Sequence, residues 1–352
     1  MKRIDAGGHR QEPWLNAQGE VTVKTARYFL WLLLCFCSGP AVYAQNNYPI
    51  ILAHGLGGSE KILDIYPYWG NADVYMRERG FNVYVPSVTP YNSSYARGEE
   101  LAEKIRNYLV SQGAQCVGEL GVSGLNCTTK VHIIGHSQGG LDARHVAKLA
   151  GPGMVRSVLT VATPHQGACL ASELILINGL GFNFLEFLVN LFGRYTYDAD
   201  QEGSRPIDAR AAAQFLDPFN ASCLVGDCSE HRDINVFNAE HPLESGIDYF
   251  SVRAATVLPR LPFIPTGWMT GSCGGFSGRG IWNDGLVELE SQALGNVLCY
   301  RAPGLRPACF NCSGCANPLL LDHLDEIGTP LTFFNHREFY LSAARWLKEL
   351  PE

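Results

Sequence analysis

The stretch that most limits how this chain can fold is 131–140, which reads Val-His-Ile-Ile-Gly-His-Ser-Gln-Gly-Gly. Its first four residues form a mainly β-branched run that predicts a short strand buried on both faces. Gly-x-Ser-x-Gly follows at once, and residues 141–150 are typical of a helix. A sharp turn between a strand and a helix is the context in which this motif exposes a nucleophilic serine. We therefore predict that Ser137 is a nucleophile at the apex of the turn. The alternative is a glycine-rich turn that only lets the two elements pack closely.

Elements on both sides of this turn alternate between strand and helix. Strands are predicted at 48–53, 81–85, 131–134, 155–161 and 249–254, and helices at 71–79, 99–112, 141–150 and 337–348. The alternation predicts an α/β protein with a mostly parallel central sheet and helices on both faces. Residues 257–280 are rich in proline and glycine and predict a loop. Ligands of such sheets bind beyond the carboxyl ends of the strands, where we expect the loop at 54–58, Ser137 and His165.

The segment at about 170–220 interrupts the alternation. Within it, residues 182–192 form an apolar stretch of helical length whose only polar residues are Asn183, Glu186 and Asn190. One interpretation is a helix buried in the core, and the other is a mobile helical lid over an apolar cleft. Exposing its eight apolar side chains to water would cost on the order of 10 kcal/mol, so such a lid would open only against lipid.

The segment 1–44 predicts an export signal. Basic residues precede the apolar run 28–37, and small side chains favour cleavage between Ala44 and Gln45. The run is short for a membrane span, which makes an uncleaved anchor the weaker alternative. The mature chain, 45–352, is then expected to be one secreted domain.

The charge of the mature chain argues against nucleic acid as a partner. The full chain has a net charge of −7, and loss of the export signal, with five Lys and Arg against three Asp and Glu, lowers it to −9. Nucleic-acid binding depends mainly on neutralising phosphates with cationic side chains.

Ten cysteines remain after the export signal, an even number that predicts disulfides in an exported chain. Four of them lie in a cysteine-rich loop at about 299–318, where a Cys-x-x-Cys-x-x-Cys run could alternatively bind a metal. The oxidising compartment favours disulfides there. Glycine-containing loops between the cysteines favour two local pairs, Cys116–Cys127 and Cys223–Cys228, and the other pairings stay open.

A serine hydroxyl is a weak nucleophile unless a histidine takes its proton and a carboxylate orients that histidine. In α/β-hydrolases the acid and then the histidine follow the serine along the chain. His323, in a loop, fits that order better than His336, which begins a helix, while His165 precedes any suitable acid. Asp284 is the preferred acid, and Asp248 is the fallback.

Attack on an ester creates an oxyanion that needs N–H donors already aimed at it. The amide of Gln138, directly after the nucleophile, is one predicted donor. The other is the amide of Leu56, in the glycine-rich loop that follows the strand at 48–53.

Six short motifs occur in order across about 48–330: YPIILAHGL at 48–56, RGEEL at 97–101, GHSQGG at 135–140, TPHQG at 163–167, NDGLV at 283–287 and HLDE at 323–326. Together they resemble the secreted true lipases of the Pseudomonas and Burkholderia type. The resemblance implies the α/β-hydrolase fold, a helical lid, and hydrolysis of triacylglycerol esters at a lipid–water interface by Ser137, Asp284 and His323. Some relatives depend on a dedicated folding chaperone, which is a further partner to test.

The same resemblance implies a structural calcium ion near the catalytic histidine, with Asp325 as a ligand. Two departures weaken this implication. Thr329 stands where the family has a glutamine ligand, and no aspartate occurs between Ser251 and Asn283 to supply another. The cysteine-rich loop suggests that disulfides stabilise this half instead. No cofactor is expected for the chemistry itself.

The leading hypothesis is therefore a secreted serine lipase that forms an acyl-enzyme on Ser137. A secreted esterase, a polyester depolymerase or an acyltransferase with the same three residues is the alternative. A third hypothesis, from a different class, is a lipid-binding module on a hydrolase scaffold, against which the complete set of catalytic groups argues.

Overall fold

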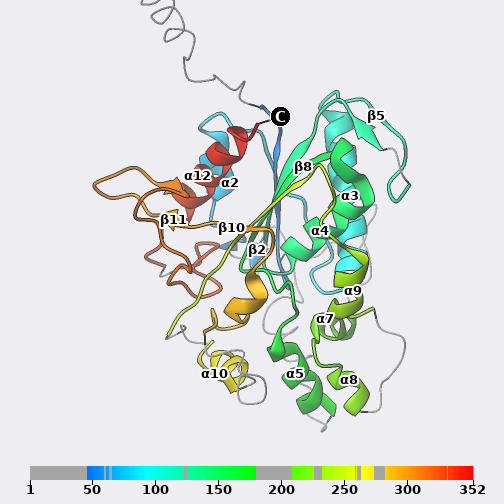
Figure 1. Ribbon diagram of the computed structural model, residues 1–352, viewed down its shortest axis with the longest axis vertical. Helices are drawn as coiled ribbons and strands as arrows, with labels where there is room; N and C mark the ends of the chain where they lie inside the picture. The colour runs from blue at the N-terminus through cyan, green and yellow to red at the C-terminus, as the bar shows by residue number, and fades with distance from the viewer. Residues whose placement is uncertain are drawn as a thin grey trace, which may run out of the picture. The chain divides into compact units, whose positions relative to one another are not determined.

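Six parallel strands form the central sheet, in the order β10-β9-β8-β7-β1-β4 (Figure 1). The strands are β1 (Ile50–Ala53), β4 (Val83–Tyr84), β7 (Val131–His136), β8 (Val155–Val161), β9 (Asp248–Val252) and β10 (Asn296–Val297). Every residue of β1 and β7 is buried, as expected for strands that are covered on both faces. The predicted α/β architecture with a mostly parallel central sheet is confirmed.

This computed structural model describes residues 46–58, 61–62, 66–122, 125–179, 208–225, 232–257, 259, 263–272, 282–330 and 332–351. Three sequence predictions lie outside the described residues: the export signal at 1–44, the apolar helix at 182–192, and Cys228 with its proposed pairing. Within the described ranges, no helix is both long and apolar enough to cross a membrane.

Helices cover both faces of the sheet (Figure 1). α2 (Ala72–Arg77) and α12 (His336–Lys348) pack on one face, and α3 (Ser94–Ser111) and α4 (Gly139–Ala150) on the other. The alternation of side chains along β1 divides the interior accordingly, with Ile50 and Leu52 in one apolar core and Ile51 and Ala53 in the other. The helices predicted around these positions are therefore correct in kind, with ends that differ by a few residues.

Further helices and short hairpins surround the sheet. α5, α7, α8 and α10 gather at the end where the parallel strands finish (Figure 1). The helical segments are α5 (Cys169–Gly179), α7 (Ala209–Leu216), α8 (Ala221–Leu224), α9 (Ile234–Glu240), α10 (Ile264–Ser272) and the 3-10 turns η1 (Gly151–Gly153) and η2 (Leu289–Gln292). The hairpins are β2 (Lys61–Ile62) with β3 (Tyr66–Pro67), β5 (Cys116–Val117) with β6 (Asn126–Cys127), and β11 (Tyr300–Arg301) with β12 (Cys309–Phe310).

The loop predicted for 257–280 is wrong in its described part, which contains helix α10. Pro265 lies in the first turn of this helix, where a missing N–H costs no intrahelical hydrogen bond. Thr270 is buried and donates its hydroxyl to Thr266 O at 2.8 Å. Packing thus outweighs the low helix propensity of the glycines in this segment.

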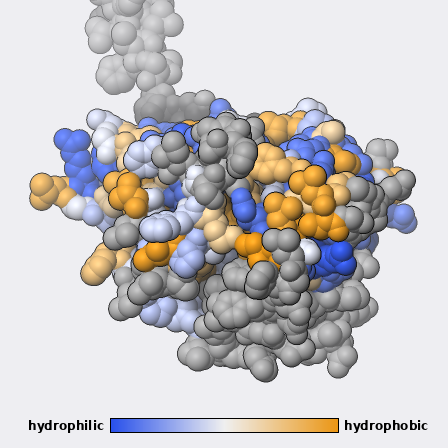
Figure 2. All heavy atoms as spheres, turned by 90° about the horizontal axis from the view of Figure 1, so that it is seen from below, coloured by the Kyte–Doolittle hydropathy of each residue, from blue (hydrophilic) through white to orange (hydrophobic). Residues whose placement is uncertain are grey.

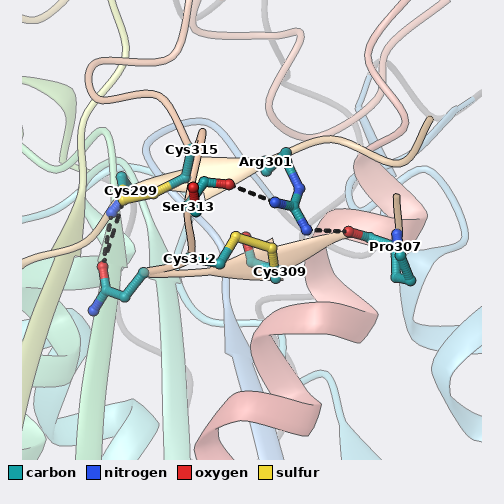
Figure 3. The surroundings of a disulfide bond; sticks show 8 residues. Cys299, Arg301, Pro307, Cys309, Cys312, Ser313 and Cys315 are labelled. Atoms are coloured by element: carbon teal, nitrogen blue, oxygen red, sulfur yellow. Dashed lines mark hydrogen bonds between the residues drawn. A yellow bond between two sulfur atoms is a disulfide. The ribbon is translucent and has the colours of Figure 1, made fainter. Parts of the chain in front are cut away.

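Both cysteines of three disulfides lie within the described residues. Cys116 pairs with Cys127 across β5 and β6, which confirms one predicted local pair. Around hairpin β11–β12, Cys299 pairs with Cys315 and Cys309 with Cys312 (Figure 3). The alternative of metal binding by this loop is therefore wrong, because its sulfur atoms are bonded to one another.

Seven of the buried histidines among the described residues make the stability of the fold depend on acid in the same direction. Burial lowers the pKa of each, because removal from water disfavours the charged ring. His132, for example, contacts Ser157 Oγ at 2.7 Å and Asn46 Oδ1 at 2.8 Å in the interior. The pKa values of His54, His132 and His145 fall to about 3 and that of His241 to about 4, and those of His136, His165 and His336 are also lowered.

We predict that the free energy of unfolding falls steeply as the pH drops from about 7 to 4. Unfolded histidines take up protons near pH 6.5, whereas these folded histidines stay neutral to lower pH, so acid favours unfolding throughout this window. For each extra proton that the unfolded chain binds, the free energy of unfolding falls by ~1.4 kcal/mol for every unit by which the pH drops. Burial raises the pKa of Glu326, so the folded chain holds a proton there that the unfolded chain releases. This one proton partly offsets the effect of the histidines. Urea melts at pH 7, 5.5 and 4 measure the slope.

His132→Asn is the control variant for this prediction, because it removes one of the seven rings. The variant should take up about one proton fewer when it unfolds in acid, so its free energy of unfolding should depend less steeply on pH. An unfolding midpoint that does not change between pH 7 and pH 4 would contradict the explanation.

Candidate active site

Ser137 lies at the turn from β7 to α4. Its φ of 55° puts a non-glycine residue in the left-handed region, and its N–H donates to Val161 O at 2.9 Å. Gln138 is the N-cap of α4, so the serine stands just before the positive end of that helix. The strand, strained turn and helix predicted around the serine are all observed, and such a turn holds a nucleophile away from its own strand.

Two glycines let other backbone segments approach this turn closely. A Cβ atom on Gly139 would lie 2.2 Å from Ala53 O, at the end of β1. A Cβ atom on Gly55 would lie 2.6 Å from the Cβ of Ser137. The loop that follows β1 can therefore lie directly against the serine only because position 55 has no side chain.

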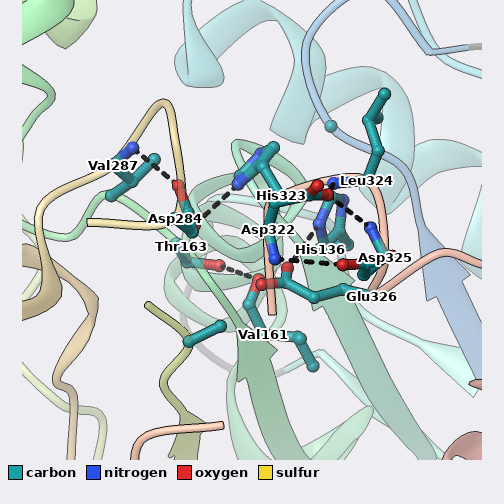
Figure 4. Close-up of polar contacts among 12 residues, drawn as sticks. His136, Val161, Thr163, Asp284, Val287, Asp322, His323, Leu324, Asp325 and Glu326 are labelled. Carbon is teal, nitrogen blue, oxygen red and sulfur yellow. Dashed lines mark hydrogen bonds and ion pairs between the residues drawn. The ribbon is translucent and has the colours of Figure 1, made fainter. Parts of the chain in front are cut away.

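Asp284 and His323 form a buried hydrogen-bonded pair (Figure 4). His323 Nδ1 lies 2.8 Å from Asp284 Oδ2, and the N–H of His323 donates to Asp284 O at 2.9 Å. Asp284 Oδ1 accepts the N–H groups of Leu286 and Val287 at 3.0 and 2.9 Å. A carboxylate held in this way favours the Nδ1–H tautomer of the ring and makes Nε2 the basic nitrogen.

Gln292 fixes Asp284 from another side, and the sequence did not single it out. Its Nε2 donates to Asp284 Oδ2 at 3.2 Å and to Ala254 O at 3.0 Å, while its Oε1 accepts the N–H of Ala254 at 2.7 Å. The side chain is fully buried. A lone glutamine carries no motif, so only the tertiary structure identifies this support.

The rings of His136 and His323 bring the serine turn and the histidine loop together. Their centroids lie 4.7 Å apart, and His136 immediately precedes Ser137. His136 Nε2 lies 2.9 Å from Glu326 Oε2, and nitrogen and oxygen atoms of His136, His323 and Glu326 all lie within 4.8 Å of one another (Figure 4). Asp284 and His323, which are far apart in the sequence, thus lie together, and the residue that precedes Ser137 packs against the ring of His323.

In the loop after β1, the amide of Leu56 has no hydrogen-bond acceptor among the described residues, whereas the amides on either side of it do. Gly55 N–H donates to the Tyr68 hydroxyl and Gly57 N–H to Pro90 O, each at 2.8 Å. No hydrogen bond in the described part of the chain uses the N–H of Leu56, and the same holds for the amide that follows the serine. Two amides without an acceptor beside a nucleophile are what an oxyanion site requires.

Arg97 sets the orientation of the peptide between Gly55 and Leu56. Its guanidinium donates to His54 O at 2.7 Å and to Gly55 O at 3.3 Å, and it forms a buried ion pair with Asp142 at 2.8 Å. His54 Nδ1 lies 2.9 Å from the same Gly55 O. Because C=O and N–H point in opposite directions in a trans peptide, holding Gly55 O on one side aims the N–H of Leu56 to the other.

The alternative base and acid residues lie in other surroundings. Asp248 begins β9, at the opposite end of the parallel strands, and pairs with Arg156 at 2.7 Å. His336 begins α12, as predicted, and contacts Gly70 O at 3.0 Å. His165 lies after β8 as expected, but it is buried against a threonine hydroxyl of that strand.

The calcium site that the resemblance implies stays a prediction, and the carboxylates around Asp325 already accept hydrogen bonds within their own turn. Asp325 Oδ2 accepts the N–H of Asp322 at 3.3 Å, and Asp322 Oδ1 accepts the N–H of Asp325 at 3.0 Å, so the two carboxylates cap one turn reciprocally. Thr329 donates its hydroxyl to Leu324 O at 3.0 Å. In the described ranges, the only cluster of three His, Cys, Asp or Glu ligand atoms is the one around His323.

Comparisons with known proteins show a similarity to a family of thioesterases and to bacterial lipases. A family model described as palmitoyl protein thioesterase matches residues 49–196. Triacylglycerol lipases of Pseudarthrobacter phenanthrenivorans and Burkholderia plantarii are each 33% identical over 183 residues, which cover 49% of this chain and 53% and 47% of those proteins. The chain thus spans about half the length of the curated relatives it matches.

Solved structures extend the likeness in fold to most of the chain. Lipase 1 from Pelosinus fermentans has a TM-score of 0.53 at 20% identity, and the match covers 87% of this chain and 100% of that one. The predicted resemblance to Burkholderia-type lipases and the predicted fold are both confirmed. The chain therefore has the α/β-hydrolase fold and is similar in sequence to bacterial triacylglycerol lipases over about half of their length.

Proposed function

We propose that this protein is a secreted triacylglycerol lipase that works through an acyl-enzyme on Ser137. The observation that carries the proposal is the Asp284–His323 pair, with its 2.8 Å hydrogen bond, beside a strained serine turn. The amides of Leu56 and Gln138, which have no acceptor among the described residues, supply the matching oxyanion donors. These groups together make up the parts that ester hydrolysis by a serine requires.

In the proposed reaction, Ser137 Oγ attacks the acyl carbon and its proton passes to His323 Nε2. Asp284 holds the Nδ1–H and stabilises the imidazolium that forms, and the N–H groups of Leu56 and Gln138 bind the oxyanion. Collapse of the tetrahedral intermediate breaks the C–O bond, and His323 returns the proton to the departing alcohol. Water then attacks the acyl-enzyme by the same steps in reverse, which releases the fatty acid and restores the serine.

Apolar surface at the active-site end supports a lipid substrate. Trp268 on α10 is 78% exposed, Leu224 on α8 is 77% exposed, and Leu56 beside the serine is 41% exposed. Figure 2, which looks at the end where the strands finish, shows hydrophobic side chains gathered in patches on this face. The names of the relatives, triacylglycerol lipase, give the same substrate class.

A rate that jumps when a short-chain triglyceride exceeds its solubility would support a lipase, and smooth saturation would favour an esterase.

The proposed secretion rests on the disulfides and on the sequence of the first 44 residues. Disulfides persist in oxidising compartments, and three of them join described cysteines. The predicted export signal with cleavage between Ala44 and Gln45 would deliver the chain there. The need for a dedicated folding chaperone stays a prediction, which refolding of the purified chain alone would test.

Hydrolysis of long-chain acyl thioesters is the second candidate function, because the matching family model is described as palmitoyl protein thioesterase. The same serine, base and oxyanion donors serve both reactions, since both pass through a tetrahedral oxyanion. Comparing kcat/KM for palmitoyl esters and palmitoyl thioesters decides between them.

We expect Ser137→Ala to lower ester hydrolysis by about 10⁴-fold or more, because the nucleophile is lost while the oxyanion donors remain. Folding should be preserved, since alanine and serine are equally strained at a φ of 55°. Turnover of nitrophenyl and triglyceride esters measures the loss. An alkyl phosphonate should label the wild-type protein at residue 137 and leave the variant unlabelled.

Ser111→Ala is the matched control, because Ser111 ends α3 with an exposed hydroxyl that donates to Tyr108 O. It should hydrolyse esters and react with the phosphonate as the wild type does. Wild-type turnover by Ser137→Ala would refute the assignment of the nucleophile, and a folded wild type that neither reacts nor hydrolyses would favour a lipid-binding module.

We predict that a chelator changes neither the melting temperature nor the activity, because the carboxylates of Asp322 and Asp325 already accept N–H groups of their own turn. Reduction should instead lower the melting temperature, since loss of a native disulfide typically costs ~2–5 kcal/mol. Thermal melts with EDTA, with calcium and with a reductant measure both effects. A melting temperature that EDTA lowers and calcium restores would contradict this prediction.

A further inference from the structure

We propose that Tyr68 is a positioning residue for the oxyanion site, because its hydroxyl joins the amide of Gly55 to the ring of His136. The inference rests on the proposed function, since it concerns the same serine. It names a residue that neither the motifs nor the family resemblance identified.

A continuous chain of hydrogen bonds runs from the loop after β1 to the histidine loop. Gly55 N–H donates to the Tyr68 hydroxyl at 2.8 Å, this hydroxyl lies 2.8 Å from His136 Nδ1, and His136 Nε2 lies 2.9 Å from Glu326 Oε2. Tyr68, His136 and Glu326 are all buried. The chain therefore links the segment that carries Leu56 with the segment that carries His323.

One arrangement of protons gives every group in this chain a partner. The Tyr68 oxygen accepts a hydrogen bond from Gly55 N–H, and its O–H donates to an unprotonated His136 Nδ1. In this arrangement His136 is the Nε2–H tautomer and donates to the unprotonated oxygen of Glu326, whose pKa burial raises. Burial keeps this arrangement, because it raises the pKa of Tyr68 above its usual value and lowers the pKa of His136 well below its own.

Tyr68 also packs directly beneath the loop. A Cβ atom on Gly58 would lie 2.6 Å from Cε2 of the Tyr68 ring, and one on Gly55 would lie 2.8 Å from its hydroxyl. The second position is also 2.6 Å from the Cβ of Ser137. The hydroxyl therefore reaches the point where the loop and the serine meet.

Both peptide groups next to Leu56 on its N-terminal side are thus held in place. Tyr68 holds the N–H of Gly55, and Arg97 holds the carbonyls of His54 and Gly55. Without the phenolic hydroxyl, Gly55 N–H becomes a buried donor without an acceptor, and the peptide can rotate to reduce that cost. The N–H of Leu56 would then point less accurately at the oxyanion, which exists only after attack.

The proposal therefore predicts an effect on the transition state and little effect on substrate binding. Tyr68→Phe keeps the ring and removes the hydroxyl. We expect kcat to fall ~10- to 50-fold with KM within a factor of about two, a smaller loss than the 10²–10³ typical of deleting an oxyanion donor itself. The affinity for an alkyl boronic acid, which forms a tetrahedral adduct with the serine, should fall in parallel.

Tyr340→Phe is the matched control. Tyr340 is a fully buried phenol on α12 whose hydroxyl has no hydrogen-bond partner among the described residues. Its ring lies 5.2 Å from Trp69, whose ring in turn lies 5.3 Å from Tyr68. The control should keep wild-type kcat, KM and boronate affinity, because it removes a neighbouring hydroxyl that positions nothing in the loop.

All rates are divided by the concentration of sites that a phosphonate titrates, so that partly folded protein does not imitate the effect. A kcat for Tyr68→Phe within twofold of the wild type, or a raised KM with unchanged kcat, would overturn the positioning role. An equal loss in Tyr340→Phe would also overturn it, because any buried hydroxyl would then suffice. A wild-type protein that the phosphonate does not label would instead reject the proposed function itself.

Discussion

The buried ion pair between Arg97 and Asp142 joins the segments on which the oxyanion half of the site depends. The guanidinium extends from α3 to the first turn of α4 after Ser137, and it also donates to the carbonyls that follow β1 and β4. Its acceptors therefore lie on three different parts of the chain. Removal of one partner of such a pair typically costs ~3–5 kcal/mol, because the other charge stays buried. Here the loss would reach function too, since Gly55 O is among the acceptors.

The site consists of two halves with different kinds of support. The serine and the oxyanion amides belong to the parallel sheet and lie within the span 49–196 that matches a family model. Asp284 and His323 lie beyond that span, in turns held by side-chain hydrogen bonds such as those of Gln292. Leu319 bonds to Arg253 and Ala255 just before the histidine loop, and Cys299–Cys315 closes the hairpin that precedes it. Disulfides and polar turns, rather than regular strands, therefore hold the acid and the base.

The hydrogen bonds around the serine leave the N–H groups of Leu56 and Gln138 without an acceptor among the described residues. Around Leu56, the neighbouring amides and carbonyls are bonded to Tyr68, Pro90, His54 and Arg97. An amide without an acceptor would normally cost stability in a buried place. It is tolerated beside a serine because a substrate oxygen, or solvent before binding, can take the bond. Burial of His54 and His136 in neutral form adds no positive charge that would compete with the developing oxyanion.

The sequence by itself determined the parallel α/β class, the serine turn and the Cys116–Cys127 pair. These features are local, because period, glycine spacing and short loops are encoded in neighbouring residues. Only the tertiary structure decided which side chains support them. Tyr68 contacts His136 across 68 positions, and Glu326 contacts it across 190. Gln292 and helix α10 were missed for the same reason, since isolated polar residues and weak propensities acquire their roles only when distant segments bury them together.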